Sequence, residues 1–312
     1  MNELIPALEQ AFGVDRVKRD APLAPLTTFK VGGPADIFLE TQNTDEIAQA
    51  VKLAHAAAVR VTMLGGGSNV LIGDRGIRGL VIRTRGGEVT PIGDRLVRAD
   101  AAVTINGLVR WTINRGYAGL ETWAGTPGTV GGAIYGNAHW KTINIGDLIE
   151  SVRLLKPDGT LLQVPADRME FDYDYSRLKH TGEIVVWAAF RVRPGADPAA
   201  LRLAARESLA FRKRTQPLES PSAGCIFMNP DRVRDKLPEG IPPSAGALVD
   251  RAGLKGASLG GARVSPTHAN FIINDGSAKA AEILRLVEQC RSAVKDQFGV
   301  LLRNEIICLG EF

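Results

Sequence analysis

Residues 64–71 of the chain run Leu-Gly-Gly-Gly-Ser-Asn-Val-Leu, and the three consecutive glycines restrict what this segment can be. Glycine has no Cβ, so backbone N–H groups can approach an anion closely and positive φ angles cost little. Ser68 and Asn69 add side-chain donors. The pattern predicts a phosphate cradle for a dinucleotide cofactor, with a tight turn that binds nothing as the alternative. It is neither the Walker motif of NTPases nor the Rossmann fingerprint of dehydrogenases. The cradle residues are Gly65, Gly66, Gly67, Ser68 and Asn69.

Composition limits the class of protein and its partners. The chain has 312 residues, 45% of them hydrophobic, which is enough for two or three domains. The net charge of +4 is scattered, with no basic strand interleaved with aromatics, so we expect no nucleic acid partner. Three cysteines without a Cys-x-x-Cys pair indicate neither a disulfide framework nor a zinc site. With no export signal or membrane-spanning run in the sequence, we expect a cytoplasmic protein.

Element order predicts three domains. Residues 1–83 alternate strands with helices, at 4–12 and from Asn43 or Thr44, as in a small α/β domain. Residues 84–197 combine short strands with a helix that Thr104 caps and Gly116 ends. Residues 198–312 form the third domain, with helices expected at 199–214 and, capped by Ser277, at 277–298. Cys290 falls on the apolar stripe of that last helix and is expected in the core.

A second glycine-rich stretch covers residues 124–137. It contains five glycines and a proline, so we expect irregular structure there and a second surface of backbone donors facing the first loop. Its predicted cofactor-binding residues are Thr126, Pro127, Gly128, Thr129, Gly131, Gly132 and Asn137.

Together these motifs resemble the MurB family, the UDP-N-acetylenolpyruvoylglucosamine reductases. The similarity extends over nearly the whole chain and keeps the motif order, so it is specific although each motif alone is weak. The matching segments are residues 27–35, 64–71, 125–137, 221–230, 252–256, 264–274 and 304–306. His268 belongs to this pattern, and we expect packing or hydrogen bonding from it and not catalysis.

The resemblance implies an α+β protein. It consists of a two-subdomain FAD-binding fold of the PCMH or vanillyl-alcohol-oxidase type, plus a C-terminal α/β substrate-binding domain, in the family type without the extra Tyr-loop insertion. FAD lies between the first two domains with its pyrophosphate at the glycine loops. It is non-covalent, because Ser68 and Asn69 stand where related oxidases carry the attaching histidine.

The implied reaction belongs to peptidoglycan precursor synthesis. NADPH reduces FAD, and the flavin then reduces UDP-N-acetylglucosamine enolpyruvate to UDP-N-acetylmuramate. NADPH and this UDP-sugar use one site in turn, and no membrane or obligatory protein partner is implied.

The family's site residues carry over position by position. Cys225 stands at the proton donor position, which is usually serine, and Glu305 matches the glutamate that stabilises or protonates the enolic intermediate. A buried structural cysteine and a surface carboxylate are the alternatives. Tyr173 is expected to contact substrate, Asn229 the uridine diphosphate, and Lys213 or Arg214 its phosphates.

Three departures lie on the substrate side. Asp174 replaces the catalytic arginine, Met228 replaces a lysine, and residues 139–142 read His-Trp-Lys-Thr in place of a small Gly-Ala-Tyr-Gly stretch. Lys141 or Arg177 could supply the lost charge, although strand alternation would point residue 177 to the opposite face. The alternative function is therefore an FAD-binding MurB-like paralogue, serving as a binding or regulatory module, that has lost or changed the reaction.

Overall fold

A computed structural model describes residues 3–312 of the chain, so residues 1 and 2 of the predicted first domain lie outside it. The chain folds into two compact units. Unit 1 comprises Met1–Ala21, Asp36–Gly66 and Arg78–Phe211, and unit 2 comprises Pro22–Ala35, Gly67–Ile77 and Arg212–Phe312. Both predicted FAD-binding subdomains fall largely within unit 1, and the division into three domains at residues 83 and 197 stays a prediction.

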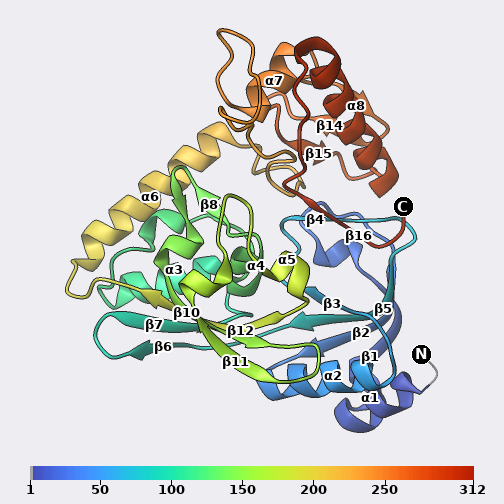
Figure 1. Ribbon diagram of the computed structural model, residues 1–312, viewed down its shortest axis with the longest axis vertical. Helices are drawn as coiled ribbons and strands as arrows, with labels where there is room; N and C mark the ends of the chain where they lie inside the picture. The colour runs from blue at the N-terminus through green and yellow to red at the C-terminus, as the bar shows by residue number, and fades with distance from the viewer. Residues whose placement is uncertain (1–2) are drawn as a thin grey trace. The chain divides into compact units, whose positions relative to one another are not determined.

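The first sheet of unit 1 has four strands in the order β1-β2-β5-β3, with β3 and β5 parallel. Helices α1 and α2 lie together against it, and their apolar residues share a core with the sheet (Figure 1). Gly13 ends α1 at φ 92°, and Asn43 caps α2 by accepting the N–H of Glu46, both as predicted. The elements are α1 (Leu4–Phe12), β1 (Val17–Pro22), β2 (Pro34–Thr41), α2 (Thr44–Ala56), β3 (Val61–Leu64) and β5 (Ile77–Thr84).

The second sheet of unit 1 is antiparallel, in the order β11-β10-β12-β7-β6. Its core includes the fully buried Trp123 and Phe190. The elements are β6 (Val89–Ile92), β7 (Leu96–Asp100), α3 (Ile105–Asn114), α4 (Val130–Tyr135), β8 (His139–Trp140), β9 (Ile143–Asn144), β10 (Ile149–Leu155), β11 (Leu161–Pro165), α5 (Leu178–Thr181), β12 (Ile184–Arg191) and α6 (Pro198–Thr215).

Helix α4 corrects a prediction, because it lies within the glycine-rich stretch that was expected to be irregular. The hydroxyl of Thr129 accepts a hydrogen bond from Gly132 N–H and caps its first turn. Val130 and Ile134 are fully buried. Capping and apolar burial therefore outweigh the low helix propensity of glycine.

Unit 2 is built around the long helix α8. Helices α7 and α8 pack beside the sheet β13-β14-β15, with Leu248, Val287 and Cys290 in the core (Figure 1). The predicted burial of Cys290 is confirmed. Strands β4 and β16, from distant parts of the sequence, pair in parallel. The elements are β4 (Val70–Ile72), α7 (Ala245–Arg251), β13 (Ser258–Leu259), β14 (Ala262–Val264), β15 (Ile272–Asn274), α8 (Ala280–Phe298) and β16 (Ile307–Leu309).

The predicted cap of α8 is wrong. The helix begins at Ala280, and the Ser277 hydroxyl donates to Asp275 instead. The first-turn N–H groups of Ala280 and Ala281 donate to the carboxylate of Asp74, at 2.8 and 2.9 Å. An acid at this position also suits the positive end of the helix dipole. Within residues 3–312, no helix has the length and apolar character needed to span a bilayer.

Candidate active site

The two glycine loops meet within unit 1, as predicted. A Cβ added to Gly66 would lie 2.7 Å from the Cα of Gly128, and one added to Gly65 would lie 2.6 Å from the hydroxyl oxygen of Thr129. Real Cβ atoms are essentially never this close to backbone, so residue 66 must be glycine for the loops to approach this closely, while a Cβ at residue 65 would require the Thr129 side chain to move. The approach brings the two predicted sources of backbone donors together.

A cavity of about 380 Å³ opens beside these loops. Its lining combines glycine backbone with two arginines, which is the chemistry that a diphosphate requires. Burial lowers the pKa of Arg83, the charge of Arg85 lowers it further, and Glu40 partly offsets both. The lining includes Gly65, Gly66, Arg83, Arg85, Gly87 and Thr129. These residues fit the pyrophosphate of FAD. Arg83 and Gly87 were missed at the sequence level, although Arg-Gly-Gly at residues 85–87 was a usable signal.

The rest of the second loop is fixed by hydrogen bonds within unit 1. Asn106 donates to Thr126 O and accepts from Gly125 N–H. Asn137 is buried, and its amide donates to Asp172 O at 2.7 Å and accepts from Gly146 N–H at 2.9 Å. Asn137 therefore holds the loop in shape. Pro127 and Gly132 are exposed, whereas Gly131 is partly buried.

The remainder of the first loop lies in unit 2 and connects to the C-terminal segment. Gly67 has φ 63°, and its carbonyl accepts from Thr28 N–H at 3.0 Å. The Asn69 amide donates to Glu305 O at 3.1 Å, and Ile307 N–H donates to Asn69 O at 3.0 Å. Asn69 thus positions the backbone of Glu305, while Ser68 is partly exposed beside it.

Cys225 and Glu305, separated in sequence, are brought together in unit 2. Glu305 N–H donates to Ile226 O at 2.8 Å, so the two residues stand on adjacent segments. The buried side chain of Asn270 holds the cysteine segment through the backbone N–H and carbonyl of Phe227, two residues after Cys225. Its amide accepts from Phe227 N–H at 2.9 Å and donates to Phe227 O at 2.7 Å. Sequence analysis did not single out Asn270, whose partners lie far away in sequence.

The environment of Cys225 keeps its thiol protonated. Burial raises the pKa of the Cys225 thiol well above its usual range, the nearby Glu305 carboxylate raises it further, and a hydrogen bond with Asn270 only partly offsets them. A protonated thiol next to a carboxylate is an arrangement that can deliver a proton.

Residues 171–177 form a tight turn and not a strand, so strand alternation does not apply to them. Asp172 and Tyr175 exchange backbone hydrogen bonds of 3.1 and 3.0 Å, and Asp174 takes φ 51°. Asp174 is 6% exposed and accepts from the Lys179 ammonium at 3.0 Å. Burial raises the pKa of Asp174, and the charge and hydrogen bond of Lys179 oppose that rise. The ring of Tyr173 lies 4.8 Å from that of His139.

The two cations considered as replacements for the arginine are both held elsewhere. Arg177 forms a two-point ion pair with Glu183, at 3.0 and 2.8 Å, and donates to Arg168 O. Lys141 lies over the ring of Phe211, 4.9 Å from its centroid. His139, Trp140 and Lys141 belong to the short β8–β9 hairpin.

The predicted substrate residues Asn229 and Lys213 differ in surroundings. The Asn229 side chain accepts from Ala245 N–H at 3.0 Å, at the start of α7. Lys213 and Arg214 are exposed at the end of α6, whereas Arg212 is buried and burial lowers its pKa to about 10. Helical spacing alone did not reveal which of these three cations is buried.

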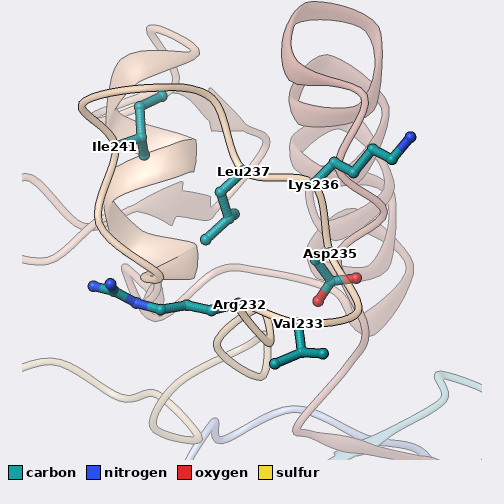
Figure 2. Close-up of a pocket in the computed structure, with 6 residues that line it drawn as sticks. All are labelled: Arg232, Val233, Asp235, Lys236, Leu237 and Ile241. Atoms are coloured by element: carbon teal, nitrogen blue, oxygen red, sulfur yellow. The ribbon is translucent and has the colours of Figure 1, made fainter.

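The loop after Asn229 borders an open pocket of about 320 Å³ (Figure 2). It is lined by Arg232, Val233, Asp235, Lys236, Leu237 and Ile241. Met228 N–H donates to Arg303 O, and Arg303 in turn pairs with Asp235 at 3.5 Å, which ties this loop to the cysteine segment.

His268 has the packing and hydrogen-bonding role expected of it. Its ring stacks edge-on against Phe271 at 4.9 Å, and Nδ1 accepts from Asn270 N–H at 3.2 Å. Burial lowers the pKa of His268, which favours the neutral imidazole.

Comparison with known families matches both parts of the chain. Residues 35–165 match the family described as "FAD binding domain". Residues 216–309 match the family described as "UDP-N-acetylenolpyruvoylglucosamine reductase, C-terminal domain". Together with the mixed helices and sheets of the structure, these matches confirm the predicted fold class.

Full-length relatives carry the same description. The UDP-N-acetylenolpyruvoylglucosamine reductase of Trichormus variabilis is 38% identical over 299 residues, 95% of this chain and 87% of the relative. That of Halalkalibacterium halodurans is 33% identical over 312 residues and the full length of both chains. The crystal structure of the enzyme from Thermus caldophilus superposes with a TM-score of 0.77 at 31% identity, covering 94% of this chain and 99% of that one.

Proposed function

This chain belongs to the MurB family of UDP-N-acetylenolpyruvoylglucosamine reductases, and we propose that it reduces UDP-N-acetylglucosamine enolpyruvate to UDP-N-acetylmuramate with NADPH as reductant. The observation that carries the proposal is the pairing of Cys225 and Glu305 on adjacent segments, joined by the 2.8 Å hydrogen bond from Glu305 N–H to Ile226 O.

FAD is the cofactor of this family, and when bound it would supply the hydride chemistry that links NADPH to the enolpyruvyl double bond. The backbone of Gly65, Gly66 and Gly128 would hold its pyrophosphate, with Arg83 neutralising charge. The Cβ-free approach of the two loops supports this assignment. Of the other predicted contacts, Thr126, Thr129 and Gly131 belong to the same glycine-rich stretch as Gly128. Asn69 and Asn137 hold the two loops in shape through hydrogen bonds.

Cys225 is proposed to donate the proton that completes the reduction. The thiol S–H bond breaks, and its proton adds to the α-carbon of the substrate, so that hydride at the β-carbon and proton at the α-carbon together saturate the double bond. The raised pKa of the thiol keeps Cys225 protonated at neutral pH. Glu305 is proposed to stabilise or protonate the enolic intermediate from the adjacent segment.

Recognition of the UDP-sugar is assigned to residues outside this pair. We propose that Tyr173 contacts the substrate, Asn229 the uridine diphosphate, and Lys213 its phosphates. We propose, from this product, a role in peptidoglycan precursor synthesis and so in cell shape and division. Its three free cysteines support a reducing, cytoplasmic location.

An anaerobic visible spectrum of the purified protein tests the function. We expect a yellow protein that bleaches when NADPH is added and recovers its colour when UDP-N-acetylglucosamine enolpyruvate follows. Bleaching without recovery would keep the flavin and contradict the substrate assignment. A colourless protein that FAD does not reconstitute would contradict the role of both glycine loops.

A further inference from the structure

The turn at residues 172–175 places a buried acid where the family has its arginine, and a lysine covers that acid. We propose that Lys179 is the cation that binds the carboxylate of the substrate's enolpyruvyl group, with Asp174 as the residue that positions it. The proposal rests on the function proposed above, because that function supplies the carboxylate.

Two acceptors on one residue fix the Lys179 ammonium. It donates to the Asp174 carboxylate at 3.0 Å and also to the Asp174 backbone carbonyl. An ammonium has three N–H donors, so one remains for a ligand. The Lys179 side chain is 22% exposed and the Asp174 side chain only 6%, so the lysine is the more accessible member of the pair.

The backbone of the turn explains why an aspartate occupies position 174. Asp174 has φ 51°, in the left-handed region that Asp and Asn tolerate better than most residues. This conformation turns its carbonyl and its carboxylate toward the same lysine. An arginine at position 174 would carry the positive charge itself. Here the positive charge beside position 174 belongs to Lys179 of α5.

Arg177 and Lys141 contact groups other than Asp174. Arg177 is held by Glu183 and by Arg168 O, and Lys141 lies over Phe211. Buried ion pairs add little to stability when compared with apolar replacements, so stability alone does not explain the presence of this pair. Tyr173, the residue next to Asp174 in the turn, is itself a proposed substrate contact.

Calorimetric binding of two UDP-sugars isolates the carboxylate. UDP-N-acetylmuramate carries the lactyl carboxylate, and UDP-N-acetylglucosamine lacks it. We expect Lys179→Met to weaken binding of UDP-N-acetylmuramate by about 10- to 100-fold, the range for a hydrogen bond to a charged group. Binding of UDP-N-acetylglucosamine should change less than about twofold.

Lys179→Arg should keep most of the affinity, and Asp174→Asn should tighten binding of UDP-N-acetylmuramate by removing a competing negative charge.

Lys179→Met leaves Asp174 buried without its cation, so the double variant Asp174→Asn/Lys179→Met guards against misfolding. It should show the same selective loss. Lys18→Met removes an exposed lysine of unit 1 and should bind both UDP-sugars like the wild type. Unchanged binding of UDP-N-acetylmuramate by both Lys179→Met variants, or equal weakening of both UDP-sugars, would overturn the proposal. A wild-type protein that binds neither sugar would instead contradict the proposed function.

Discussion

At the scale of single residues, the proposed chemistry depends on the protonation of Cys225. An exposed thiol has a pKa of about 8.5 and would lose its proton as the pH rises past that value. Burial and the Glu305 carboxylate raise the pKa of Cys225 above this range, so the protonated donor persists to higher pH. We therefore expect the rate at which substrate restores the flavin colour to stay level from about pH 7 to 9. Stopped-flow absorbance of the NADPH-reduced protein measures this rate.

Two cysteine variants test whether Cys225 is the proton donor. Cys225→Ala should slow the recovery of colour by about 10²- to 10⁴-fold, the usual contribution of a positioned acid, while bleaching by NADPH is retained. Cys308→Ser alters an exposed free cysteine and should leave both steps unchanged. A wild-type rate that falls tenfold per pH unit above pH 8.5, with Cys225→Ala showing no such fall, would contradict the raised pKa.

At the scale of elements, Asn270 connects two segments of unit 2. Its amide satisfies both backbone groups of the buried Phe227. Asn270→Ala leaves a buried donor and a buried acceptor without partners, and each costs about 1–3 kcal/mol. We expect the free energy of unfolding to fall by about 2–4 kcal/mol in urea denaturation followed by far-UV circular dichroism.

Asn114→Ala provides a matched control for this loss. Asn114 is exposed and accepts only a long hydrogen bond of 3.4 Å from Arg202. Its removal should change the free energy of unfolding by less than about 0.5 kcal/mol. Equal losses for Asn114→Ala and Asn270→Ala would show that the Asn270 clamp contributes nothing of its own.

The sequence predicts a helix end correctly when the residue that caps or ends the helix lies close to it in the sequence. The ends at Gly13, Asn43 and Thr104 are local signals, and the structure confirms all three. The acceptor for the first-turn N–H group of Ala280 in α8 is Asp74, 206 residues away, and no local pattern reveals that contact. Helix α4 was missed because glycine content outweighed the Thr129 cap in the prediction.

The residues of the candidate site also differ in whether a local sequence pattern predicts them. Motif similarity identified Cys225 and Glu305, because each lies in a contiguous pattern of residue types. The proposed roles of Asn270, Arg83 and Lys179 depend on partners or surroundings that only folding creates, and the sequence therefore did not single them out. The roles of the predicted residues stay predictions until the variants above are measured.

At the scale of the whole molecule, binding of FAD should be linked to stability through the contact of the two glycine loops. A ligand that binds only the folded protein stabilises it by about 2.7 kcal/mol at one hundred times its Kd. Gly66→Ala places a methyl group 2.7 Å from Gly128 Cα, which forces the loops apart. We expect this variant to purify colourless and to show no rise in Tm when FAD is added.

Gly93→Ala is the control, because its added methyl meets open space. Since Gly93 has φ 59°, the substitution should cost about 1 kcal/mol yet keep the FAD-dependent rise. A yellow Gly66→Ala protein with the wild-type rise in Tm would show that FAD is held elsewhere.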